Sequence, residues 1–291
     1  MDIAMYEKVK RDLEELKKEE IRICYEENQG KELEVGVSRI GGCPDLPADF
    51  VWPRYKGEAF DGVDKERPLT FMAQINLKDV AAYDKTGLLP KAGILSFFYD
   101  CMTMKWGFSP EDKGCARVYY FSEEVSLHRT NVPEDLEGDA RISECRITFE
   151  ESISLPEFED YKRLKPETIS GWEEYDETRT KLGYESDGWG DRTKLLGYAD
   201  VIQNSMEEEC EILSRGYGTG SPEEYAKIPT EERADIREKS RDWLLLFQMG
   251  TISTYASEMM FGDCGHIYFW IRKQDLAEQK FDRTWLILQC S

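Results

Sequence analysis

The sequence predicts an α+β fold rich in β-strand, made of two similar sheet-containing subdomains related by internal duplication. Three observations predict this fold. Short apolar runs alternate with turn-forming residues along most of the 291-residue chain. One of these runs recurs in the second half of the chain. Apolar residues at spacings of three and four over residues 2–19 predict an N-terminal amphipathic helix, and shorter peripheral helices are expected elsewhere.

The predicted elements of the first half are separated by loops rich in glycine and proline. Alternation of apolar and polar residues predicts strands over 21–25 and 33–37. Apolar side chains on both faces of 69–77 are typical of an interior strand. Two glycines and two prolines within 41–47 predict an irregular loop of defined shape. Further strands are expected over 94–100, 117–121 and 145–149, and short helical pieces over 78–84 and 109–112.

The second half begins after a polar segment. Residues 156–192 carry acidic clusters and few apolar residues, which predicts a junction with some helix. The first subdomain then spans 1–155 and the second spans 193–291, and we expect them to form one compact unit. The second subdomain is expected to contain a strand or extended arm over 207–213, a helical insertion over 221–240, strands over 243–249, 266–271 and 284–290, and a short helix over 273–280.

The apolar runs of the two halves can be aligned on a glutamine. The run FMAQI has Gln74 at its fourth position, and the run LLFQM has Gln248 at the same position. Gly93 follows Gln74 by 19 residues and Gly265 follows Gln248 by 17, and each glycine opens another apolar run. Two lobes built in this way bury their apolar faces against each other or in one continuous sheet. Equivalent residues would then line a groove at their junction.

The charge balance excludes some classes of function. The chain has 38 Lys and Arg residues against 59 Asp and Glu residues, a formal net charge of −21. Proteins that bind nucleic acids or anionic membranes need clustered Lys and Arg, so we expect neither a nucleic-acid partner nor a membrane. The N-terminus has no apolar h-region, and no apolar run is long enough to span a bilayer, which predicts a cytoplasmic location.

Reactive side chains do not occur at the spacings of known catalytic or metal sites. The eight cysteines include no C-x-x-C pair, so reduced thiols are expected in the cytoplasm. The two histidines, His128 and His266, belong to no metal-binding motif, and neither a nucleophile elbow nor a phosphate-binding loop is present. We therefore expect no cofactor and no metal and name no catalytic residue. A carboxylate pair cannot be picked out among so many acids.

The groove between the lobes is the expected place for a ligand. Gln74 and Gln248 would be equivalent residues in it. Trp52 stands in a loop beside Pro53, where an aromatic side chain can stack on a ligand or a partner. The predicted ligand-binding residues are Trp52, Gln74, Gln248 and Asp263.

Several motifs occur together along the chain. They are Gly41-Gly42-x-Pro44-x-Leu46-Pro47, Trp52-Pro53, the strand 71–77, Leu195-Leu196-Gly197-Tyr198, the segment 259–271 and the segment 285–290. With these motifs the chain resembles, over nearly its whole length, the bacterial YwqG-like domain of unknown function. Ala199 and Val201 stand where that family has prolines. The resemblance implies an α+β fold with an extensive sheet, and it implies no reaction.

Three functions remain open on the sequence alone. The first is a non-catalytic protein-interaction role of the immunity type, in which the acidic chain neutralises a basic protein partner. The size of the net charge favours this interpretation. The second is a small-ligand-binding module with a cleft between the two subdomains. The third is a hydrolase that uses carboxylates, although a non-enzymatic role is the preferred expectation.

Overall fold

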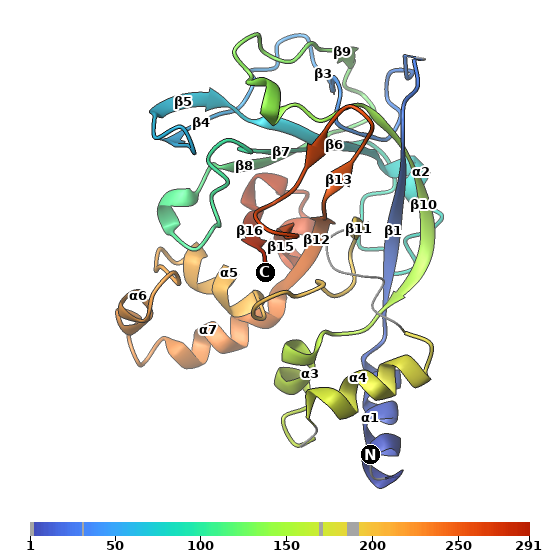
Figure 1. Cartoon of the computed structure of the whole chain (residues 1–291), viewed down its shortest axis with the longest axis vertical. Helices are drawn as coiled ribbons and strands as arrows, with labels where there is room; N and C mark the ends of the chain where they lie inside the picture. Colours follow the sequence, from blue (N-terminus) through green and yellow to red (C-terminus); the bar gives the residue numbers. More distant parts are fainter. Residues whose placement is uncertain (1–2, 31, 169–170, 185–191) are drawn as a thin grey trace.

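The computed structural model describes residues 3–30, 32–168, 171–184 and 192–291. It has an α+β fold around one nearly closed sheet of ten antiparallel strands (Figure 1). In order across the sheet, the strands are β16 (Trp285–Gln289), β15 (His266–Arg272), β12 (Trp243–Met249), β11 (Lys194–Leu195), β1 (Lys18–Glu27), β10 (Cys145–Ser154), β2 (Arg39–Ile40), β6 (Thr70–Asn76), β7 (Ile94–Tyr99) and β8 (Ala116–Phe121).

Smaller elements surround this sheet. Three two-stranded sheets pair β3 (Asp45–Leu46) with β9 (His128–Arg129), β4 (Arg54–Glu58) with β5 (Asp64–Pro68), and β13 (Ile252–Ser253) with β14 (Glu258–Met259). The α-helices are α1 (Ile3–Leu16), α2 (Leu77–Val80), α3 (Phe158–Leu164), α4 (Trp172–Lys181), α5 (Glu207–Ser214), α6 (Pro222–Ala226), α7 (Arg233–Lys239) and α8 (Lys273–Ala277). Four 3-10 helices are η1 (Pro110–Asp112), η2 (Gly138–Ala140), η3 (Ser240–Asp242) and η4 (Phe281–Arg283).

The main sheet has four strands on each side of a central pair, and on each side they follow in chain order from the centre to the edge. The long central pair β1–β10 keeps one register from Lys18 opposite Ser154 to Glu27 opposite Cys145. On one side follow β2, β6, β7 and β8, and on the other side follow β11, β12, β15 and β16. The strand β1 precedes β2 in the chain but pairs with β11, and β10 precedes β11 but pairs with β2. Each long strand is therefore placed in the other half of the sheet.

The registers of the two halves agree around the aligned glutamines. Each glutamine lies opposite a cation, and its strand has an irregularity shortly before it. The opposed pairs are Gln74 with Arg39 and Gln248 with Lys194, and the irregularities lie between Phe71 and Ala73 and between Leu245 and Phe247. The two glutamines thus have equal positions in the sheet. The internal duplication itself remains a prediction.

The loop that follows β7 joins the two edges of the sheet. The carbonyl of Trp106 accepts a hydrogen bond from Leu288 N at 3.0 Å, and the carbonyl of Gly107 accepts one from Trp285 Nε1 at 2.9 Å. A side chain at Gly107 would place its Cβ 1.9 Å from a carbonyl oxygen of β16, so only glycine fits this close approach. These contacts nearly close the sheet.

Both halves contribute to one apolar core on the concave side of the sheet. The rings of Phe97 from one half and of Phe247 and Phe269 from the other are all fully buried. The centroid of the Phe97 ring lies 4.4 Å from that of Phe247 and 5.2 Å from that of Phe269. Of the two arrangements expected from the sequence, one continuous sheet is observed, and burial of these rings stabilises both halves together.

Two groups of helices pack outside this core. Met206, Cys210 and Leu213, which come from α5 and the residue before it, cover the outer face of β12, β15 and β16. The helices α1, α3 and α4 form a separate group beside the N-terminus (Figure 1). The rings of Tyr161 and Tyr175 are buried there, with centroids 4.6 Å apart.

The prediction of a strand over 33–37 is wrong. This segment is a loop and turn, in which Gly36 has a φ of +87° that an extended strand does not use. Its carbonyls bind side chains instead of a neighbouring strand. Leu33 O accepts from Arg129 at 2.6 Å and Glu34 O accepts from Arg39 at 2.8 Å.

The strand or extended arm predicted over 207–213 is also wrong, because these residues form α5. The spacing of Met206, Cys210 and Leu213 suits one face of a helix, and glutamates in the first turn favour its positive N-terminal end. The helical segment predicted over 221–240 is divided into α6 and α7 around Pro229. The other predicted strands are present within a few residues of their expected ends.

Candidate functional site

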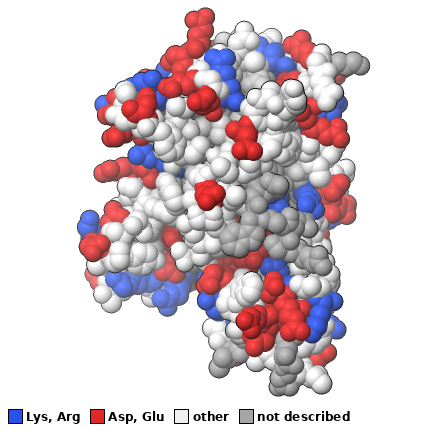
Figure 2. All heavy atoms as spheres, in the orientation of Figure 1, with Lys and Arg blue, Asp and Glu red and all other residues white. Residues whose placement is uncertain are grey.

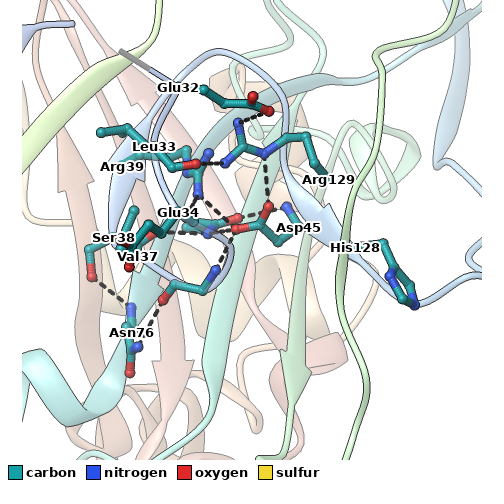
Figure 3. A network of polar contacts seen from close by, with 12 residues as sticks. Glu32, Leu33, Glu34, Val37, Ser38, Arg39, Asp45, Asn76, His128 and Arg129 are labelled. Atoms are coloured by element: carbon teal, nitrogen blue, oxygen red, sulfur yellow. Dashed lines mark hydrogen bonds and ion pairs between the residues drawn. The ribbon is translucent and has the colours of Figure 1, made fainter.

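A buried aspartate holds the loop that follows the short strand β2. Asp45 is fully buried, and Figure 3 shows Arg39 and Arg129 directed toward it. Its carboxylate accepts hydrogen bonds from Arg39 at 2.7 Å and from Arg129 at 2.9 Å. Gln74 donates to the same carboxylate at 2.7 Å and accepts from the backbone N–H of Asp45 at 2.8 Å. The buried charge is therefore paired and hydrogen-bonded, as a charge in a protein interior requires.

A second aspartate makes the same contacts in the other half of the sheet. Asp200 follows Lys194 by six residues, as Asp45 follows Arg39. Its carboxylate accepts from Lys194 at 2.9 Å and from Gln248 at 2.7 Å, and its backbone N–H donates to Gln248 at 2.9 Å. We call the two groups the Asp45 cluster (Arg39, Asp45, Gln74, Arg129) and the Asp200 cluster (Arg192, Lys194, Asp200, Gln248).

The Asp200 cluster is ionised at neutral pH. Burial by itself would raise the pKa of Asp200, but the nearby Lys194 and Arg192 outweigh it and lower this pKa to about 2. Burial opposes the charge of Lys194 too, yet Asp200 and Glu20 raise its pKa. Because both partners stay charged, the cluster acts as a structural ion pair and is not a proton donor near neutral pH.

The four predicted ligand-binding residues have four different sets of neighbours. Gln74 and Gln248 are fully buried, and their side chains hold the two aspartate loops. Trp52 donates from Nε1 to the carbonyl of Leu69 at 2.9 Å. Asp263 is exposed, and its carbonyl accepts from Ser291 N at 3.1 Å. The structure brings the glutamines into equivalent positions, while the binding role of the four residues stays a prediction.

A cleft with a volume of about 470 Å³ opens beside the loop that follows β11. We call it the Tyr198 cleft. Its apolar lining comes from Leu88, Leu164, Leu196, Tyr198, Trp243, Leu244 and Leu245. Its charged lining comes from Lys17, Lys18, Arg163, Arg241 and Lys273 and from Glu19 and Glu207. This volume and this mixture of apolar walls with a few charged groups are typical of small-ligand sites.

Three cations of the Tyr198 cleft, Lys18, Arg241 and Lys273, form no ion pair with a carboxylate in the described part of the chain. The Nζ of Lys18 lies 3.7 Å from the centroid of the Tyr198 ring, in a cation–π contact. Although Lys18 is exposed to the cleft, desolvation by the surrounding protein lowers its pKa. An anion entering the cleft would meet these cations.

Glu207 brings a carboxylate to the same cleft. Its Oε1 accepts from Arg163 at 2.5 Å, and its buried Oε2 has no hydrogen-bond partner among the described residues. Burial first, and then the nearby carboxylate of Asp160, raise the pKa of Glu207 to about 7, against the opposing effect of Arg163. Glu207 can therefore exchange a proton near neutral pH, which is a property typical of functional sites.

A smaller cavity of about 150 Å³ occupies the equivalent position in the other half of the sheet. Thr70 and Phe71 line it, and they precede Gln74 by the same intervals by which Leu244 and Leu245 precede Gln248. The position of Lys18 on β1 is taken by Ile142, just before β10. Its further lining is Gly42, Cys43, Val132, Leu136, Ala140 and Arg141. The guanidinium of Arg141 is bound to the carbonyl of Leu136 at 2.9 Å.

Sequence reasoning does not identify the Tyr198 cleft. Lys18 falls at the end of the predicted helix 2–19, and Glu207 falls in the segment expected to be extended. Tyr198 enters only as part of a motif. The one available signal is the alignment of the glycine loops, because Gly197 and Gly42 stand at equivalent places beside the two cavities.

Some kinds of site are absent from the described residues. In this part of the chain, no group of three or more His, Cys, Asp or Glu side chains is placed to hold a metal ion. No helix in the same residues is both long and apolar enough to cross a membrane. The cysteines at positions 24, 43, 101, 115, 145, 210 and 290 are free thiols.

Residues 38–290 match the model of a family described as Domain of unknown function (DUF1963). The chain belongs to this family. A comparison with curated proteins finds no match. The matched residues include both aspartate clusters and most of the Tyr198 cleft, whereas Lys17, Lys18 and Glu19 precede them.

Proposed function

We propose that the chain binds a small amphipathic anion in the Tyr198 cleft. The observation that carries this proposal is the presence of Lys18, Arg241 and Lys273 in one cleft of a chain with a formal net charge of −21, with no ion pair to a carboxylate of the described residues. An anionic group on the ligand would supply the missing counter-charge. The leucine and aromatic walls would cover the apolar part of the same ligand.

The cavity beside Gly42 supports this proposal. It has the equivalent place in the strand framework, with Ile142 in place of Lys18. The framework therefore does not need a cation at this position in order to fold. Under the internal duplication that we also propose, two similar units share the sheet. The cavity beside Gly42 is lined by one cation, Arg141, whereas the Tyr198 cleft is lined by five. Binding of an anion would then account for the larger number of cations in the Tyr198 cleft.

Anilinonaphthalene sulfonate, a fluorescent aromatic anion, is a suitable probe. We expect it to bind the wild-type chain, and we expect Lys18→Met to weaken binding by about tenfold, or about 1.4 kcal/mol. Lys91→Met is the matched control, because Lys91 is exposed and does not line the cleft. The neutral analogue phenylnaphthylamine should bind more weakly than the sulfonate. Equal binding of the two probes, or an unchanged Lys18→Met variant, would contradict the proposal.

A basic protein partner is the second function we propose. It is supported by the net charge, and Figure 2 shows acidic side chains grouped toward both ends of the face in view. Such a surface accelerates association with a cation-rich protein. Immobilised chain should then retain a basic protein from cells of the source organism at low salt and release it at high salt. Retention that does not depend on salt would count against this function.

Two finer interpretations also remain proposals. One places the chain in the bacterial YwqG-like group, on the motifs named above. The other is a carboxylate-based hydrolase, for which Glu207 of the Tyr198 cleft and the nearby Asp160, which does not line the cleft, would be the acidic pair. Loss of the probe-binding cations without any effect on turnover of a hydrolysable substrate would separate catalysis from binding.

A further inference from the structure

We propose that the Tyr198 cleft takes up a proton together with its anion and that Glu207 is the group that receives this proton. The inference rests on the proposed function. It starts from the position of Glu207, whose Oε2 is buried and unpartnered within the described residues while the residue lines the cleft. A protonated carboxyl at this place has an O–H to donate, whereas an ionised one has only acceptor atoms.

Charged groups from five elements face Glu207 or its cleft. From α3, Arg163 donates to Glu207 at 2.5 Å and to Asp160 at 3.3 Å, so one cation serves two carboxylates. From β1, Lys18 contributes a positive charge. Arg241 and Lys273, from η3 and the start of α8, line the same cleft. On α5 itself, the nearby Glu209 is a further buried carboxyl.

This arrangement penalises a third negative charge. When Glu207 is ionised, it and Asp160 share the single cation Arg163. The negative charges of the two carboxylates then repel an incoming anion, and Arg163 is already paired with both of them. Protonation of Glu207 removes one of these negative charges, so the electrostatic cost of bringing an anion into the cleft falls. Since the bound anion favours the protonated form, proton uptake and anion binding must strengthen each other.

Glu209 provides an internal comparison. Burial, with help from Glu207 and Glu208, raises the pKa of Glu209 to about 7, which is the value for Glu207 too. Its Oε2 is also buried without a partner among the described residues. However, Glu209 does not line the cleft, whereas Glu207 does. If position in the cleft decides the coupling, only Glu207 should report the anion.

The test is calorimetric titration of the full chain with anilinonaphthalene sulfonate, whose sulfonate stays ionised throughout, from about pH 6 to about pH 8. Buffers of different ionisation enthalpy give the number of protons taken up. For the wild type we expect uptake that approaches one proton at the higher pH, and an affinity that falls by up to about tenfold per pH unit there.

The variants distinguish the two glutamates. Glu207→Gln keeps an oxygen for Arg163, and we expect it to bind with no proton uptake and to exceed the wild type in affinity at the higher pH. Glu209→Gln should behave as the wild type does. Binding by the wild type without proton uptake would overturn this inference and leave the proposed function intact. No binding at any pH would overturn both.

Discussion

Buried polar residues of this chain differ in how fully their hydrogen bonds are satisfied. Gln74 and Gln248 use both their oxygen and their nitrogen atoms on the aspartate loops. His266 is also buried, but neither of its ring nitrogens has a partner among the described residues. A histidine in this situation is held in its neutral form, because an imidazolium would be both desolvated and unpaired.

His266 should make the fold less stable at acid pH. Burial first, and also Lys194 and Arg192, lower the pKa of His266 from 6.5 to about 4. The unfolded chain then binds the proton more readily, so stability present above pH 6.5 is lost as the pH falls toward 4. The loss reaches at most about 3 kcal/mol. Urea unfolding of the wild type and of His266→Leu at neutral and acid pH measures it, and equal acid losses in both would refute this account.

Single residues are the scale at which sequence reasoning is weakest here. The importance of Lys18 depends on the ring of Tyr198, which is distant in the chain, and on the lack of an ion pair between Lys18 and any carboxylate of the described residues. The raised pKa of Glu207 depends on Asp160 from another helix. No local pattern encodes these neighbours, so the cleft can be found only once the chain is folded.

The two aspartate clusters explain why the loops after β2 and β11 have defined shapes. Each loop turns back so that its aspartate meets the cation of the short strand that the loop follows, Arg39 or Lys194. A glutamine from the neighbouring strand, opposite that cation in the sheet, fixes the loop. Sequence reasoning correctly aligned these glutamines, because the apolar runs around them are alike. It placed them in a groove, whereas the structure has them fully buried.

Replacing either glutamine with leucine should destabilise the fold. Gln74→Leu leaves the N–H of Asp45 and the carbonyl of Val37 without their partner, and Gln248→Leu does the same for Asp200 and Arg192. We expect a loss of about 1–3 kcal/mol for each unsatisfied group, and similar losses for the two variants. Thermal unfolding measures this, with the exposed Gln274→Leu as the control. Two variants as stable as the control would show that the glutamines do not hold these loops.

Secondary structure was predictable where the apolar pattern decides it. Strands such as β6, β12 and β15 are apolar on both faces, as an interior strand requires, and the structure has them as buried strands. Two segments follow other rules. Carbonyls of 33–37 accept hydrogen bonds from arginine and amide side chains instead of from a neighbouring strand. The segment 207–213 presents one helical face to the sheet. Both failures arise because long-range contacts override a short local pattern.

At the scale of the whole molecule, the exchange of β1 and β10 joins the two halves. The long strand β1, which precedes β2 in the chain, pairs with β11, and the long strand β10, which precedes β11, pairs with β2. Phe97 packs on Phe247 and Phe269 across the shared core. The sequence could indicate two similar halves. It could not show that β1 pairs with β11 and β10 with β2, because the residues of one strand do not specify which distant strand pairs with it.

The two halves of the sheet should therefore unfold together. Native-state hydrogen exchange measured against increasing denaturant should give the amides of β7 and β15 one common free energy of opening, since they share the core. Amides of α1 and α4, which pack in the separate helical group, serve as the comparison. A free energy of opening that differs between β7 and β15 by more than about 1 kcal/mol would indicate two independent units.

The central claim is that the Tyr198 cleft is the binding site of this protein. A crystal of the chain grown with a bromonaphthalene sulfonate tests it most directly, because the anomalous signal of bromine locates the ligand. We predict one strong bromine peak between the apolar walls of the cleft, with the sulfonate toward Lys18, Arg241 and Lys273. Bromine peaks only at other places on the molecule, with the cleft filled by water, would contradict the account.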